Sequence, residues 1–152
     1  MKFTDLLGKR LKDDDVVEVL ECHDINVIYD FDRTHENMQD VYWAPSTDAG
    51  FQFRFNEDQV LDSVFLYVTA REGFLAISRD EIDVPVFDTF DDAEQEPRSK
   101  GFPFKQSQGS LGSDGYKWWI KIDFGAYTVH YQFKQGFLCM VTLGLTPIER
   151  SS

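Results

Sequence analysis

The feature that most constrains the fold is a self-similarity at half the chain length. When the 152-residue sequence is shifted by 76 residues without a gap, its most strongly patterned stretches coincide. The matched positions are Tyr42-Trp43 with Trp118-Trp119, Phe51, Phe53 and Phe55 with Tyr127, Val129 and Tyr131, Gln59 with Gln135, Leu61 with Phe137, and Val64 with Met140. A repeated unit too small to bury its own core must pack against its copy. The sequence predicts pseudo-repeats 1–76 and 77–152 in a single domain, residues 1–152, with a chance match between aromatic-rich strands as the alternative.

Each half carries the pattern of a β-hairpin. Residues 51–55 alternate phenylalanine with Gln52 and Arg54, and residues 127–133 repeat this period of two. Such alternation predicts strands with one buried and one polar face. Polar or glycine-containing turns should then lead into apolar returning strands. The predicted turns and returning strands are 56–59 with 60–68, and 134–136 with 137–143.

A candidate helix precedes each hairpin. The carboxylates of residues 13–15 are typical of a helix start, and residues 16–20 carry an apolar stripe. Asp88-Thr89 provides caps for a second helix over residues 90–95, which we expect to end at Pro97 because proline disfavours a continuing helix. The apolar stripe of this second helix is almost absent.

Two polar segments complete the sequence pattern. Residues 32–40 predict a polar connection, and residues 99–115, rich in glycine, serine and lysine, predict a long flexible loop. Two units of helix, strand and hairpin should combine into one layered structure. The predicted fold class is α+β, with one antiparallel sheet and its helices on one side.

The charge balance indicates which partners are suitable. The chain has 27 acidic and 15 basic residues and a net charge of −12, which repels phosphate backbones and anionic membranes but attracts basic proteins. We therefore expect no direct nucleic-acid or membrane binding. No apolar run approaches the roughly 20 residues of a membrane span, and Met1–Asp5 does not resemble a signal peptide. A soluble cytoplasmic protein is expected, with Cys22 and Cys139 as buried free thiols.

The residues give little indication of catalysis. His23, His35 and His130 have no metal-ligand spacing around them, and no P-loop, dinucleotide fingerprint or nucleophile elbow is present. We expect no catalytic residues, no metal and no cofactor, and hence no enzyme. The alternative is a small hydrolase that uses His130 together with a carboxylate.

The stretch from Glu81 to Pro97 has seven acidic residues and no basic residue, with apolar residues interleaved. A solvated acidic edge is one interpretation. The other is a docking surface, on which charges steer a basic partner and exposed aromatics anchor it. Tandem aromatics on a strand place one ring on each face, so one ring of each pair should be exposed. The candidate partner-binding residues are Asp88, Asp91, Asp92 and Glu94 for steering, and Phe90, Trp118 and Trp119 as anchors.

One segment and two strand pairs carry a resemblance to a known family. Residues 3–9 (FTDLLGK), the strand pair 50–55 with 64–67, and the pair 127–132 with 141–143 resemble small cytoplasmic bacterial proteins encoded beside polymorphic toxins. The duplicated layout is also similar to β-lactamase inhibitor protein-like tandem repeats and to small outer-membrane assembly lipoproteins, whose lipobox cysteine has no counterpart near Met1.

This resemblance implies a protein that binds another protein. The leading hypothesis is an immunity protein of a contact-dependent growth inhibition system or a related one. It would neutralise a cognate toxin domain, a basic nuclease, by covering its active site or substrate surface. The alternative is a non-catalytic adaptor with an endogenous protein partner.

Overall fold

The structure, a computed structural model, describes residues 2–30, 40–107 and 117–145. The segments 31–39 and 108–116, which hold most of the expected polar connection and part of the expected flexible loop, lie outside these ranges. No helix within the described ranges combines the length and apolar character needed to cross a bilayer. The elements are α1 (Phe3–Leu6), α2 (Asp14–Cys22), β1 (Ile28–Asp30), β2 (Val41–Ser46), β3 (Phe51–Phe55), β4 (Leu61–Tyr67), the 3-10 helix η1 (Arg79–Glu81), α3 (Phe90–Lys100), β5 (Phe104–Gln106), β6 (Lys117–Asp123), β7 (Tyr127–Lys134) and β8 (Phe137–Leu145).

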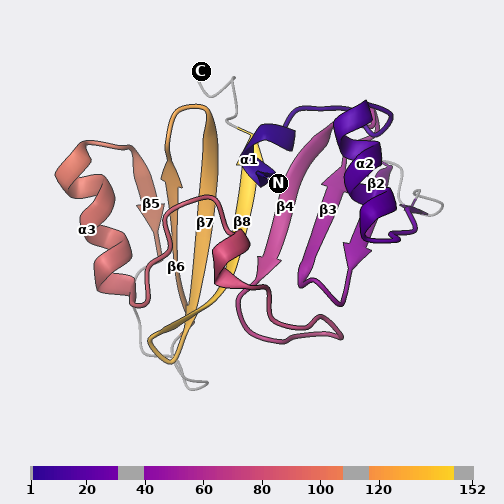
Figure 1. Cartoon of the computed structure of the whole chain (residues 1–152). Coiled ribbons are helices and arrows are strands. Elements are labelled where there is room, and N and C mark those ends of the chain that lie inside the picture. Colours follow the sequence, from indigo (N-terminus) through magenta and orange to yellow (C-terminus); the bar gives the residue numbers. More distant parts are fainter. Residues whose placement is uncertain (1, 31–39, 108–116, 146–152) are drawn as a thin grey trace.

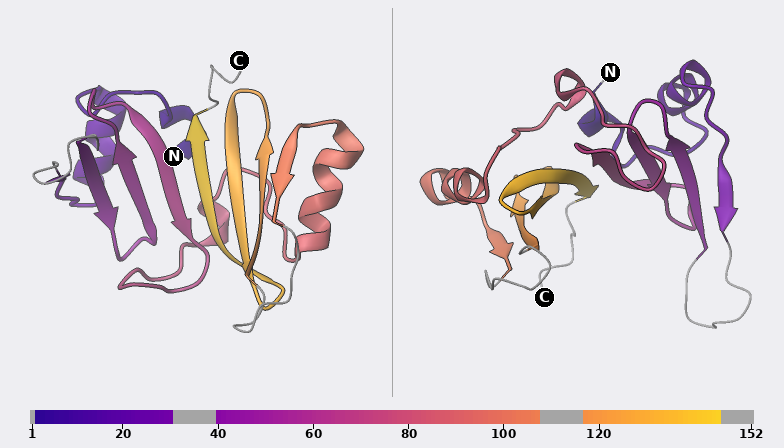
Figure 2. Two further views of the ribbon diagram at one scale, coloured as in Figure 1. Left: turned by 180° about the vertical axis from the view of Figure 1, so that it is seen from behind. Right: turned by 90° about the horizontal axis from the view of Figure 1, so that it is seen from below.

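The eight strands form one antiparallel sheet in the order β1-β2-β3-β4-β8-β7-β6-β5. Strands β1 to β4 form one half of the sheet and β5 to β8 form the other, and the two halves are joined where β4 pairs with β8 (Figure 1). The views from behind and from below show the helices on the same face of the curved sheet (Figure 2). The α+β class and the single antiparallel sheet with helices on one side are therefore confirmed.

The core lies between the helices and one face of the sheet, as the alternation in the strands predicts. Phe51, Phe53 and Phe55 of β3 are fully buried, and the ring of Phe3 from α1 packs edge-on to Phe51 at 5.2 Å. On β7 the side chains of Val129, Tyr131 and Phe133 are buried in the same layer. Burial of these rings in one layer supplies the hydrophobic free energy that holds both halves together.

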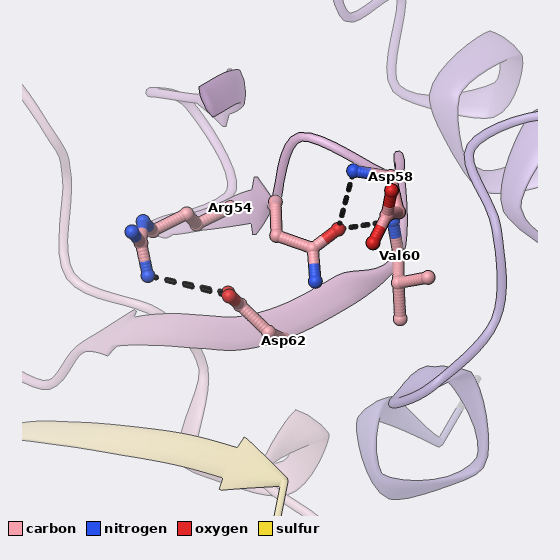
Figure 3. A network of polar contacts seen from close by, with 5 residues as sticks. Arg54, Asp58, Val60 and Asp62 are labelled. Atoms are coloured by element: carbon pink, nitrogen blue, oxygen red, sulfur yellow. Dashed lines mark hydrogen bonds and ion pairs between the residues drawn. The ribbon is translucent and has the colours of Figure 1, made fainter. Parts of the chain in front are cut away.

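The turn between β3 and β4 is held by side-chain hydrogen bonds. The Oδ1 atom of Asn56 accepts the N–H groups of Asp58 at 2.9 Å and Val60 at 3.1 Å (Figure 3). Beside this turn, Arg54 Nη1 lies 3.3 Å from Asp62 Oδ2, on the sheet face opposite the helices. Partial burial raises the pKa of Asp62, and the Arg54 charge opposes that effect.

Helix α2 begins where the sequence predicts but is capped differently. Asp13 is the N-cap residue, yet its carboxylate makes no cap hydrogen bond and instead accepts the N–H of Arg10 at 2.8 Å. Val16 and Val19 face the core. Cys22, predicted to be buried, is exposed at the last residue of α2, where the helix leaves the core. Cys139 is half-buried on β8.

Helix α3 begins at its predicted cap and runs further than expected. The Thr89 hydroxyl accepts the N–H of Asp92 at 3.2 Å. Pro97 does not end the helix: it is buried in the last turns, and its carbonyl accepts the N–H of Gly101 at 2.7 Å. Proline removes one internal donor, and the left-handed Gly101, φ +78°, closes the helix instead.

The loop expected over residues 99–115 is consequently shorter than predicted. Ser99 and Lys100 belong to α3, and residues 104–106 form strand β5, which pairs with β6 at the sheet edge. The Arg98 guanidinium lies 5.0 Å from the Phe104 ring, which joins the end of α3 to this strand.

Candidate partner-binding surface

Local ion pairs already engage three carboxylates of the acidic stretch. Asp88 lies 2.8 Å from Arg79, and along α3 Glu94 lies 2.9 Å from Arg98 and Glu96 lies 2.9 Å from Lys100. The hydrogen bond from Arg98 lowers the pKa of Glu94. Exposed pairs of this kind add little to stability, but they offset part of the negative potential. Asp88 and Glu94, both predicted to steer a partner, are therefore partly neutralised.

A fourth carboxylate, that of Asp83, has a structural role. It accepts the N–H groups of Phe3 at 3.1 Å and Thr4 at 3.0 Å, and the Thr4 hydroxyl at 2.6 Å. It therefore satisfies donors that the start of α1 leaves free. The sequence contains no signal for this contact, because the partners are about 80 residues apart.

Asp91 and Asp92 are the two predicted steering residues that remain free. Both are exposed in the first turn of α3, and neither carboxylate forms an ion pair or side-chain hydrogen bond within the described residues. The partial positive charge of the helix N-terminus favours carboxylates at this position. The structure thus places two carboxylates that have no ion-pair partner among the described residues at the beginning of α3.

An aromatic hollow of about 250 Å³ adjoins this charge. Phe90 is only 8% exposed, and its ring lies edge-on to Trp118 at 4.9 Å and to Phe133 at 5.8 Å. Phe90 therefore forms a wall of the hollow and is not the exposed anchor that the sequence suggested. The hollow is lined by Thr89, Phe90, Asp91, Trp118, Phe133 and Gly136.

The tandem aromatics divide between the two faces of the sheet, as strand alternation predicts. The expectation that one ring of each pair is exposed is wrong, because all four rings are half-buried by their neighbours. Trp118 packs against the core on the helix side, whereas Trp119 stacks on His130 on the opposite face, with centroids 5.2 Å apart. In the other half, Tyr42 packs against the core and Trp43 lies 6.0 Å from the ring of Phe65. The structure thus brings Phe90, Asp91 and Trp118 together and separates Trp119 from them.

His130, the histidine considered for catalysis, is opposite Lys121 on β6. Burial and the Lys121 charge lower its pKa. No carboxylate hydrogen-bonds to His130 within the part of the chain that is described. The same described part contains no group of three His, Cys, Asp or Glu side chains that could hold a metal ion.

Two features of this end of the sheet were not predicted from the sequence. Phe137, just after the β7–β8 turn, is 70% exposed, although its matched position, Leu61, is fully buried. A second hollow of about 390 Å³ also borders Trp118 and Phe133 and extends to Arg71. The repeat alignment hid the first feature because it treated the two positions as equivalent. The second hollow was not predicted because Arg71 lies on the loop after β4, and the strand pattern does not specify the path of that loop.

Comparisons with known proteins found no matching family model, no matching curated protein and no matching solved structure.

Proposed function

We propose that this protein is an immunity protein that acts in the cytoplasm, where it binds a cognate toxin domain and covers its active site or substrate surface. The partner is a basic protein, a nuclease of a contact-dependent growth inhibition system or a related one. The observation that carries the proposal is the juxtaposition of the unpaired carboxylates of Asp91 and Asp92 with the aromatic hollow at Phe90 and Trp118. Nucleases present basic clefts to nucleic acid, so a negative, aromatic surface competes for the same groups.

The hollow is suited to the side chain of an arginine or lysine from the toxin. The aromatic walls accept the apolar stem of such a side chain and attract its cation. Asp91 at the rim supplies a charge-assisted hydrogen bond. Asp92 is equally charged but does not line the hollow, so it adds steering without this contact.

The proposal includes an internal duplication, in which the second unit has diverged for binding. It is supported by the mirrored strand order and by the spacing of the elements, since each element of the first half has a counterpart starting 76 residues later. The paired starts are Phe3 with Arg79, Asp14 with Phe90, Ile28 with Phe104, Val41 with Lys117, Phe51 with Tyr127, and Leu61 with Phe137.

The test is co-expression with the toxin domain that we expect to be encoded immediately upstream, scored as cell survival and as affinity for a catalytically inactive toxin domain. Asp91→Asn should weaken affinity about tenfold, whereas the matched control Asp92→Asn should weaken it about threefold or less. Lack of protection and of binding by the wild type would contradict the proposed function. Equal effects of the two variants would contradict the role of the hollow but not the proposed function.

A further inference from the structure

The second hollow, of about 390 Å³, has the opposite electrostatic character to the first. Among the described residues its lining includes Arg71 and Lys134 and no carboxylate, in a chain whose net charge is −12. Lys134 has no ion-pair partner among the described residues. Within the described residues Arg71 forms one ion pair, with Glu72, whose Oε2 atom lies 4.0 Å from Arg71 Nε. A local excess of cations in an acidic protein indicates a site for a negative group.

The loop that carries Arg71 is held firmly in place. Arg71 and Phe74 exchange backbone hydrogen bonds of 3.0 and 2.8 Å around a two-residue turn, in which Glu72 and Gly73 both have positive φ. The Phe74 ring stacks on Tyr67 at 4.2 Å, and both side chains are buried. The guanidinium is therefore presented from a fixed backbone, which lowers the entropy cost of binding through it.

The remaining walls combine hydrogen-bonding groups with flat rings. Thr69 and Gln132 add a hydroxyl and an amide, and the Trp119 ring is kept in place by its stack on His130 at 5.2 Å. Concave sites of a few hundred Å³ with a few polar groups and aromatic walls are typical of small-ligand sites. Rings of this kind favour a planar ligand.

We propose that this hollow binds a small organic anion in which a carboxylate or phosphate is attached to a planar ring. The anion pairs with the Arg71 guanidinium and the Lys134 ammonium, and the ring packs against Trp119. Arg71 offers a planar fork that fits either oxyanion. Trp118 and Phe133 line both hollows. This inference nevertheless does not depend on the proposed function, because the anion pairs with Arg71 and Lys134, which do not line the toxin-binding hollow and carry the opposite charge to Asp91.

The experiment titrates the full-length protein with benzoate at low salt and follows the indole and backbone N–H signals by NMR. We expect binding with a Kd on the order of 1 mM, with shifts at Trp119 and Arg71, and at least tenfold weaker binding of benzamide, which has the same shape without the charge. Phenyl phosphate then shows which oxyanion the site prefers. Equal binding of benzoate and benzamide, or no shift with either anion, would overturn the proposal.

Variants test the two cations separately. Arg71→Gln should weaken benzoate binding about tenfold and Lys134→Gln about threefold. The control Arg79→Gln removes the same charge at a residue that does not line the hollow and should change the Kd by less than about twofold. Arg71 is exposed and makes one long ion pair with Glu72 and one weak hydrogen bond to Met140 Sδ at 3.6 Å, so the variants should remain folded, which their NMR spectra check directly. A Kd unchanged in Arg71→Gln would contradict the assignment.

Discussion

Replacing Asp83 with alanine tests whether the acidic stretch is partly structural. In the native protein the Asp83 carboxylate accepts three hydrogen bonds, from two N–H groups of α1 at 3.1 and 3.0 Å and from the Thr4 hydroxyl at 2.6 Å. These bonds connect the N-terminal segment to residues near the end of η1. The Phe3 side chain beside these bonds is fully buried, so losing the bonds should also weaken the packing of Phe3 in the core.

The magnitude follows from the number and type of bonds. A hydrogen bond to a charged group contributes about 1.5–3 kcal/mol. Three bonds that share one carboxylate are not additive, and water can replace part of each. We therefore expect Asp83→Ala to lower the free energy of unfolding by about 3 kcal/mol, which corresponds to a fall in Tm of about 6–12 °C for a chain of this size.

Urea denaturation followed by tryptophan fluorescence measures this change. Asp88→Ala is the matched control, because Asp88 belongs to the same acidic stretch but makes an exposed pair with Arg79. It should change the free energy of unfolding by less than about 0.5 kcal/mol. A cost below about 1 kcal/mol for Asp83→Ala, or equal costs for the two variants, would refute the structural role of Asp83.

Three other variants probe the core and its pH response. Gly50→Ala should lower the free energy of unfolding by more than about 3 kcal/mol, because Gly50 has φ +81° and an added Cβ would lie 2.5 Å from the Leu75 carbonyl oxygen; urea denaturation measures it. Tyr131→Phe removes a 2.7 Å hydrogen bond to the Pro85 carbonyl and should cost about 1 kcal/mol by the same assay. The pKa of His130 is lower in the folded protein than in the unfolded chain, so the unfolded chain binds a proton first as the pH falls. The stability that neutral His130 contributes is therefore complete above about pH 6.5 and is lost as the pH falls toward the folded pKa. Unfolding curves between pH 5 and 8 should show this loss in the wild type and a smaller one in His130→Gln; identical curves would contradict it.

The strands and the fold class are predictable because their signal is local. In residues 51–55 and 129–133 every second side chain is buried on one face of the sheet, so apolar residues recur with a period of two. This period identifies both hairpins in the sequence. The faces taken by Trp118 and Trp119 follow from the same rule. The start of α3 was predicted correctly from Thr89, whose side chain bonds within its own helix turn.

What the sequence did not reveal depends on contacts between distant segments. Pro97 remains inside α3 because its buried ring and the Gly101 cap outweigh one missing donor. The cap that Asp83 provides and the loop position of Arg71 both need the tertiary structure to bring separate segments together. In the candidate surface, the free or paired state of each acid likewise depends on which bases the fold places nearby, as with Arg79 beside Asp88.

The most direct test is the association rate of this protein with its proposed cognate toxin domain, measured by stopped flow at about 20 and 200 mM NaCl. We predict that the wild-type rate falls at least tenfold between these salt concentrations. We also predict that an Asp91→Asn/Asp92→Asn double variant associates more slowly at low salt and depends less on salt. A rate that is independent of salt, or the same salt dependence in both proteins, would contradict recognition by the free carboxylates at the start of α3.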